Sequence, residues 1–161
     1  MFKIRANHSE TFEVKASLEK VQDFFTDIKN FIDLMPSIES IHVDSKGVMH
    51  WKICADIPLI GSFTEKFLVE ETENSDDRIE WTPIKREKYN LMRYAADFLP
   101  KGSNKTLVQI SQFIELRRKS ASELHFLAGF AGESIISNEL SKRFSNALKT
   151  FVRHAREKLE S

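Results

Sequence analysis

Two polar side chains, Glu65 and Tyr94, are the candidates in this sequence for acid–base chemistry. Each lies in a stretch of alternating polar and apolar residues, at the phase that faces the apolar side. A carboxyl group among apolar side chains must pair with a cation or a donor, or shift its acid–base equilibrium. The spacing of the two residues matches no specific catalytic motif, so we favour binding over catalysis.

Other motifs that carry chemistry are absent. The chain has no HExxH or CxxC spacing and only five glycines, none arranged as a phosphate-binding loop. If Gly47 closes a bulged hairpin, His42 faces His50 across two strands on the outer surface. Two imidazoles are too few ligands for a zinc site, which needs three or four. The sequence therefore predicts no metal and no cofactor.

Length and charge limit the class of protein. With 161 residues, the chain has the length of a single domain, 1–161. Its 24 basic residues are balanced by 24 acidic ones, whereas a dedicated nucleic-acid binder usually has a basic excess. We therefore expect no nucleic-acid partner.

Cysteine usage and hydropathy bear on the cellular compartment. Cys54 is the only cysteine, so no disulfide can form within the chain. The charged start, residues 1–5, does not resemble a signal peptide, and no apolar run reaches the roughly 18 residues of a membrane span. These features predict a cytoplasmic protein.

The first third of the chain combines a strand with two short helices. Residues 3–14 alternate as a strand does, and Ser17 is placed to cap the helix that follows. A second helix over about 28–35 should end before Pro36, because the residue before a proline is excluded from the helical region.

After Pro36 the apolar pattern changes from helical spacing to a period of two. Short polar turns separate the alternating stretches, which is typical of an antiparallel meander. The predicted strands cover 37–43, 48–57, 62–73, 77–84, 88–99 and 105–118.

The period returns to 3.6 near residue 136 and persists for about 25 residues. This pattern predicts a long amphipathic helix with a basic outer face, whose apolar stripe must cover the sheet. The stripe consists of Ile136, Leu140, Phe144, Leu148, Phe151, Ala155 and Leu159.

The chain resembles the START-like superfamily, also called SRPBCC, and within it the polyketide cyclase/dehydrase and lipid transport branch. The matching segments are Leu34–Ile41, Trp51, Arg78–Trp81 and Leu140–Phe144. The resemblance implies an α+β helix-grip fold, in which a curved seven-stranded antiparallel sheet (β-α-α-β-β-β-β-β-β-α) surrounds the long C-terminal helix. It also implies an apolar pocket between them, although members of this superfamily bind very different ligands.

Strand phase and this resemblance together identify candidate ligand-binding residues. The candidates are Trp51, Ile53, Phe67, Val69, Trp81, Met92, Tyr94, Phe98, Ile110, Gln112, Ile114, Phe144 and Leu148. A plain core of the same residues is the alternative. Gln112 is the best polar candidate because it interrupts an apolar face in mid-strand. Asn90, His8 and Glu10 share the inward phase.

One end of the meander is predicted to be apolar. Strand parity places the 57–61 turn and the 119–133 connection at that end, beside Lys85–Lys88. The apolar side chains there are portal candidates, namely Leu59, Ile60, Leu127 and Phe130. Three readings remain open: an inward plug, a portal for a ligand, or a surface for transient docking on a membrane or protein.

The leading functional hypothesis is the binding, transport or sequestration of a small hydrophobic molecule. A lipid, an isoprenoid quinone and a polyketide-like ring are the classes considered. One alternative is an enzyme of the aromatase/cyclase or dehydratase kind that uses the same cavity. Another is a regulatory module that binds a protein at its apolar end. The sequence leaves the oligomeric state open.

Overall fold

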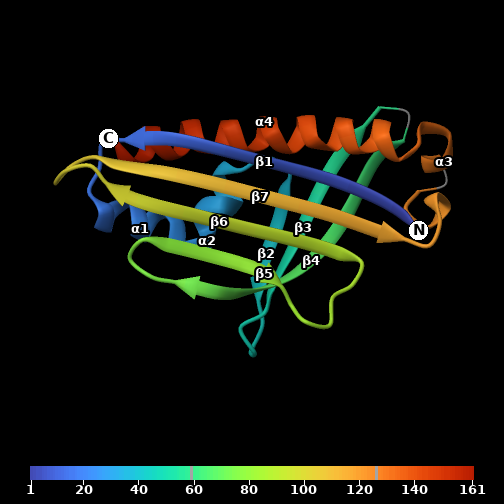
Figure 1. The fold of residues 1–161 in the computed structure, drawn as a ribbon, viewed down its shortest axis with the longest axis horizontal. Coiled ribbons are helices and arrows are strands. Elements are labelled where there is room, and N and C mark those ends of the chain that lie inside the picture. Colours follow the sequence, from blue (N-terminus) through green and yellow to red (C-terminus); the bar gives the residue numbers. More distant parts are fainter. Residues whose placement is uncertain (59, 126) are drawn as a thin grey trace.

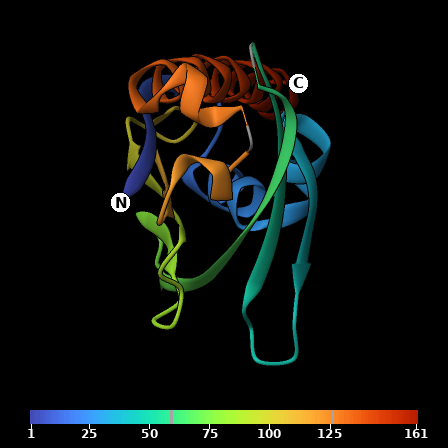
Figure 2. The same cartoon turned by 90° about the vertical axis from the view of Figure 1, so that its right-hand side faces the viewer.

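Seven antiparallel strands form one curled sheet, and a long C-terminal helix lies across its concave side (Figures 1 and 2). The computed structural model describes residues 1–58, 60–125 and 127–161, and the backbone alone of Phe63. The strands are ordered β1-β7-β6-β5-β4-β3-β2 across the sheet. This arrangement is the predicted α+β helix-grip fold, and the predicted element order is confirmed.

The elements follow one another with short connections. The strands are β1 (Phe2–Val14), β2 (Ile38–Val43), β3 (Met49–Ile57), β4 (Gly61–Asn74), β5 (Arg78–Pro83), β6 (Asn90–Pro100) and β7 (Thr106–Arg118). The helices are α1 (Leu18–Thr26), α2 (Ile28–Leu34), the 3-10 turn η1 (Ala121–Glu123), α3 (Ala128–Ala131) and α4 (Glu133–Leu159).

Side-chain caps fix the two short helices that follow β1. Ser17 Oγ accepts a hydrogen bond from the Lys20 amide at 3.3 Å and so caps α1, as predicted. Asp27 Oδ1 accepts one from the Lys29 amide at 3.0 Å and caps α2. Met35 adopts an extended conformation, as expected for the residue before Pro36, and ends α2.

The β2–β3 hairpin has the predicted register. Gly47 has a positive φ of 82°, the region that glycine enters without strain. Consequently Ile41 lies opposite Trp51, and His42 lies opposite His50. The two imidazole rings are 5.8 Å apart, and His50 Nε2 is 3.0 Å from Asp44 Oδ2. Within the described ranges, no group of three or more His, Cys, Asp or Glu side chains is arranged to hold a metal.

Helix α4 runs alongside β1 and is anchored at its C-terminal end. Its predicted apolar stripe is buried against the sheet and against α1 and α2. Lys20 Nζ donates to the Leu159 carbonyl at 2.8 Å, and Lys158 Nζ donates to Asn30 Oδ1 at 2.7 Å. Lys20 at the Leu159 carbonyl and Lys158 in the last turn also complement the negative end of the α4 dipole.

The connection before α4 contains η1 and α3, two short helical segments that the sequence did not indicate. Ala128 and Ala131 are buried, and Leu124 packs partly against the core. Phe130 is 90% exposed on the opposite side of the segment. The connection therefore has an inward-packed face and an exposed aromatic tip.

None of the described helices is long and apolar enough to cross a membrane.

Candidate functional site

The concave face of the sheet and the buried face of α4 carry the side chains that the sequence predicted as ligand-binding. All thirteen are buried: Trp51, Ile53, Phe67, Val69, Trp81, Met92, Tyr94, Phe98, Ile110, Gln112, Ile114, Phe144 and Leu148. A core and a ligand pocket both require such burial. The assignment of these residues to a ligand therefore stays a prediction.

Five aromatic side chains form a contiguous cluster at the centre of this face. The Trp81 ring is 4.9 Å from Tyr94 and 5.6 Å from Trp51, measured between centroids. Phe31 of α2 contacts all three of these rings and stacks on Phe151 of α4 at 4.8 Å. The helices thus fill the interior that the sequence analysis had left to a ligand, and Phe31 and Phe151 were missing from its predicted lining.

Three hydrogen-bond donors in this cluster have no partner. Trp51 Nε1, Trp81 Nε1 and Tyr94 Oη are buried, and none of the described residues accepts a hydrogen bond from them. An unsatisfied buried donor costs about 1–3 kcal/mol, so three of them destabilise the folded protein appreciably. Burial also raises the pKa of Tyr94 well above 10, which keeps its hydroxyl a neutral donor.

The two weak catalytic candidates do not meet. Glu65 accepts a hydrogen bond from Arg118 at 2.9 Å and another from Asn90 Nδ2 at 2.9 Å. Its carboxylate is thus paired, one of the two outcomes that the sequence allowed. No contact joins Glu65 to Tyr94 in the part of the chain that the structure describes. Gln112 is buried and lies opposite Tyr94 in the β6–β7 register.

The inward polar residues of β1 face α4. His8 Nδ1 is 3.1 Å from Ser145 Oγ, and His8 Nε2 is 3.6 Å from Glu10 Oε2. The His8–Ser145 contact joins the edge strand to the helix, and α4 packs more extensively on β1 than on β3. Helix α4 contacts β3 much less extensively, and a cleft remains on that side.

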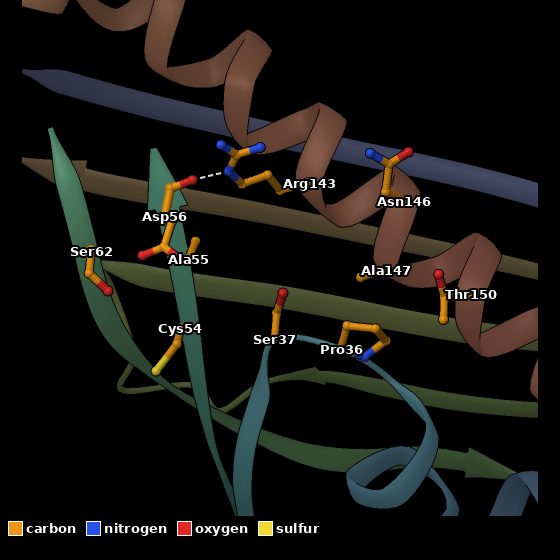
Figure 3. A pocket seen from close by; sticks show the side chains of 10 residues that line it. All are labelled: Pro36, Ser37, Cys54, Ala55, Asp56, Ser62, Arg143, Asn146, Ala147 and Thr150. Atoms are coloured by element: carbon orange, nitrogen blue, oxygen red, sulfur yellow. Dashed lines mark hydrogen bonds between the residues drawn. The ribbon is translucent and has the colours of Figure 1, made fainter. Parts of the chain in front are cut away.

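The cleft lies between α4, β3 and the chain after α2 (Figure 3). It has a volume of about 580 Å³, in the range of small-molecule sites. Its lining residues are Pro36, Ser37, Cys54, Ala55, Asp56, Ser62, Arg143, Asn146, Ala147 and Thr150.

Small side chains lie deep in the cleft and polar ones line its mouth. Ala55 and Ala147 are buried on the facing elements β3 and α4, where larger side chains would close the gap. Arg143 Nε donates to the Asp56 carbonyl and bridges the cleft at one end (Figure 3). Asn146, one turn further along α4, is exposed at the mouth.

The thiol at the edge of the cleft is already engaged. Cys54 Sγ donates to Glu39 Oε2 at 2.9 Å and is 3.0 Å from Thr64 Oγ1. The hydrogen bonds from Cys54 and then Lys52 lower the pKa of Glu39. In Figure 3 the sulfur points away from α4. The cleft therefore offers mainly polar and small apolar contacts.

The predicted portal residues Ile60, Leu127 and Phe130 are not part of the cleft lining. Ile60 is buried, Leu127 is partly buried and Phe130 is exposed. Leu59 lies outside the described residues. The exposure of Phe130 argues against a plug at that position, whereas Ala128 and Ala131 do pack inward. The portal and docking hypotheses both remain predictions.

Comparison with known proteins places the chain by its fold. No family model matches the sequence, and no curated protein matches it significantly. Solved structures do match over almost the whole chain. A protein from Deinococcus radiodurans has a TM-score of 0.62 at 18% identity, covering 96% of this chain and 100% of its own.

Two further matches carry informative descriptions. The Zhui aromatase/cyclase from Streptomyces sp. R1128 has a TM-score of 0.64 at 12% identity, covering 98% of this chain and 97% of its own. A START superfamily protein from Mycobacterium smegmatis has a TM-score of 0.53 at 16% identity, covering 89% and 97%. At these identities the matches establish fold alone. The chain has the helix-grip fold of the START-like proteins, as the sequence resemblance implied.

Proposed function

We propose that this protein binds a small, mostly apolar molecule that carries a hydrogen-bond acceptor, and that the α4–β3 cleft is its way in. The observation that carries the proposal is the set of three buried donors without acceptors, Trp51 Nε1, Trp81 Nε1 and Tyr94 Oη. A ligand oxygen that accepts from them relieves a desolvation cost already present in the empty protein. The fold, shared with START-like proteins and an aromatase/cyclase, supports the same kind of ligand.

The donors favour a carbonyl compound over a charged one. The cluster around Phe31 consists only of neutral aromatic side chains. A carboxylate placed there would be buried without a cation, which costs far more than burying a carbonyl. A quinone or a polyketide-like ring therefore suits the site better than an ionised fatty acid.

Binding requires the interior to open, because Phe31 and Phe151 stack on each other in the space between the helices and the sheet. Phe151 belongs to α4, which lines the cleft, and Phe31 belongs to α2, which ends just before the lining residues Pro36 and Ser37. Widening the cleft would separate the two rings. About 300 Å² of buried apolar ligand surface contributes roughly 7 kcal/mol, and association costs at least about 4 kcal/mol, so apolar burial alone supports only millimolar affinity. Hydrogen bonds to the three donors, at about 1–1.5 kcal/mol each, bring the total to about 6–7.5 kcal/mol, which corresponds to a dissociation constant in the micromolar range.

The test is a titration with a hydrophobic quinone and, separately, with its fully reduced, alkylated analogue. Binding is measured as quenching of the fluorescence of Trp51 and Trp81. We expect saturable quenching by the quinone at micromolar concentration and weaker binding of the analogue that lacks carbonyls. Native mass spectrometry of freshly purified protein tests for a co-purified ligand. The absence of saturable binding across quinone, polyketide-like and lipid probes would contradict the proposal.

The route of entry is tested by a variant that obstructs the cleft mouth, compared with a matched control variant outside the cleft. Asn146→Phe adds a ring at the exposed mouth, and Lys142→Phe adds the same ring one turn earlier, outside the cleft lining. We expect Asn146→Phe to slow association at least severalfold and Lys142→Phe to leave it unchanged. Equal association rates for both variants would show that the ligand uses another route, such as the Leu127–Phe130 end.

A catalytic role in the same cavity would need a base beside the ligand carbonyl. Tyr94 is suited to donate to such a carbonyl, but the carboxylate of Glu65 is bound by Arg118 and Asn90. Binding without turnover is therefore the function that these contacts favour.

A further inference from the structure

A second hollow lies on the outer face of the sheet, opposite the side that α4 covers. Strands β1, β7 and β6 are neighbours there (Figure 1), and the β5–β6 connection forms the border. The volume is about 640 Å³. The lining residues are Arg5, Pro83, Ile84, Lys85, Glu87, Leu91, Arg93, Phe113, Glu115 and Arg117.

A buried carboxylate organises the cationic side of this hollow. Glu115 is only 2% exposed although it is on the outer face. Its Oε1 accepts from Arg5 Nε across the β1–β7 pair, and its Oε2 accepts from Arg117 Nε on the same strand. Burial acts to raise the pKa of Glu115, but the two arginines outweigh it and lower the pKa overall. The carboxylate therefore stays ionised and holds both guanidinium groups in place.

These arginines retain unused hydrogen-bond donors. Only the Nε atoms of Arg5 and Arg117 are engaged, and their Nη groups have no partner in the described part of the chain. Arg93, opposite Phe113 in the β6–β7 register, is exposed and makes no side-chain hydrogen bond with a described residue, although its charge contributes to lowering the pKa of Glu80. Guanidinium groups with free Nη donors bind phosphate and carboxylate oxygens in pairs.

The hollow has an excess of positive charge. Its four cationic side chains exceed its two carboxylates, Glu87 and Glu115, by two charges. One oxygen of Glu87 accepts from the backbone amides of Lys88, Tyr89 and Asn90, so that carboxylate is committed to the loop. By contrast, the neighbouring Arg78 is neutralised by Asp97 and Glu80. Arg78, beside the hollow, is thus balanced by its own carboxylates, whereas the lining of the hollow keeps an excess of two positive charges.

Apolar side chains complete the lining beside the cations. Phe113 is partly buried between Glu115 and Arg93, and Leu91 lies opposite Glu115 in the β6–β7 register. Pro83 and Ile84, at the end of β5, are on the same border. An inorganic ion would contact only the guanidinium groups, whereas an organic anion would also bury its apolar part here.

From this arrangement we propose a second binding site, for a small organic phosphate, in which Arg5, Arg93 and Arg117 bind the phosphate and Phe113 and Leu91 contact its apolar group. Two of the three guanidinium groups, those of Arg5 and Arg117, are already positioned by Glu115, so they lose little side-chain entropy on binding. Lys85 adds long-range attraction from the β5–β6 connection. The site does not depend on the interior proposed above, because the sheet separates the two.

The test uses phenyl phosphate as the probe and isotopically labelled protein observed by NMR. We expect saturable shifts of the amides of residues 91–93 and 113–117 below about 10 mM phenyl phosphate, weakened by added salt. Inorganic phosphate should bind several times more weakly and phenol not detectably. Absence of shifts at these residues, or equal affinity for inorganic and phenyl phosphate, would overturn the proposal.

Matched variants separate a site from general charge attraction. Arg93→Gln should weaken phenyl phosphate at least about fivefold, because it removes an unpaired cation of the site. Arg153→Gln removes one charge from the exposed face of α4 and should have no effect. If both variants weaken binding equally, the attraction is nonspecific and the proposal fails. Thermal unfolding of each variant checks that the fold is intact.

The phosphate group has two natural sources, a soluble metabolite and a lipid headgroup. Vesicles of phosphatidylcholine with and without phosphatidic acid distinguish them. Co-sedimentation that depends on phosphatidic acid, is lost in Arg93→Gln and is competed by phenyl phosphate assigns the site to a headgroup. Binding of phenyl phosphate without vesicle binding assigns it to a soluble ligand. Binding of neither contradicts the site.

Discussion

Replacing Tyr94 by phenylalanine removes a single hydroxyl from the centre of the core and keeps the ring. That hydroxyl is fully buried and has no partner among the described residues. Its removal should therefore stabilise the empty protein by about 1–2 kcal/mol, the cost of an unsatisfied donor. For a chain of this length 1 kcal/mol corresponds to about 2–4 °C, so Tm should rise by several degrees.

The assay is thermal unfolding with and without ligand, and Tyr89→Phe is the matched control. Tyr89 is 52% exposed, so the loss of its hydroxyl should leave Tm unchanged. A carbonyl ligand that accepts from Tyr94 should bind about fivefold more weakly to Tyr94→Phe, since one hydrogen bond contributes about 1 kcal/mol. A fall in Tm would mean that the hydroxyl is satisfied in the empty protein, and the argument from unpaired donors would lose its basis.

Three further predictions concern the titration of Tyr94, the titration of Asp44, and the burial of Phe31 and Phe130. Because burial raises the pKa of Tyr94 well above 10, the unfolded chain releases the Tyr94 proton at a lower pH than the folded protein does. The free energy of unfolding should therefore fall as pH rises above about 10, and it should fall less in Tyr94→Phe. Hydrogen bonds from His50 and the Val48 amide lower the pKa of Asp44 to about 2. The contribution of the Asp44 carboxylate to stability should therefore be complete above about pH 4 and lost as pH falls toward 2. An NMR titration of the Asp44 carboxyl group with a midpoint near 4 would contradict this prediction. In chemical denaturation, Phe31→Ala should lower the free energy of unfolding by about 3–5 kcal/mol, because Phe31 is fully buried. Phe130→Ser should change it by less than about 0.5 kcal/mol, because Phe130 is exposed. A large loss of stability in Phe130→Ser would show that Phe130 plugs the core.

Local patterns in the sequence were sufficient to predict the strands, the two short helices after β1 and the long C-terminal helix, but not η1 and α3. The change of period near Pro36 and again near Ile136 separates helices from strands, because a half-buried strand and an amphipathic helix bury different spacings. Register within the β2–β3 hairpin also followed from Gly47 and from matching apolar side chains across the pair. The prediction that Trp81 and Tyr94 face inward holds for the same reason.

The sites could not be predicted in the same way, because they depend on distances between elements. The cleft exists because α4 packs closely on β1 and leaves a gap at Ala55 and Ala147, and no local pattern determines where a helix docks. Phe31 belongs to a helix of seven residues, too short for its apolar face to show which partners it meets. Two alanines on facing elements were the only signal of the gap, and small residues are common in cores.

The outer hollow was missed for a different reason. Outward positions on a strand are solvated by default, and Glu115 would be read as one of them. Arg5 and Glu115 are 110 residues apart, and only the β1–β7 register brings them together. A carboxylate at an outward position that is nevertheless buried can be recognised only once its neighbours are known.

The inner face of the sheet lacks hydrogen-bond acceptors for its donors, and the outer face lacks an anion for its cations. Because these needs differ, the two proposed sites can be tested independently. The inner face has buried donors without acceptors and no charge among its central rings, so it favours a neutral carbonyl compound. The outer face has guanidinium donors with a net positive charge, so it favours an anion. One ligand cannot satisfy both, because the sheet lies between them. Phenyl phosphate should therefore not compete with a quinone, Arg93→Gln should leave quinone binding intact, and Tyr94→Phe should leave phenyl phosphate binding intact. Competition between the two probes would mean that they share one site, and the outer hollow would then have to be abandoned as a separate one.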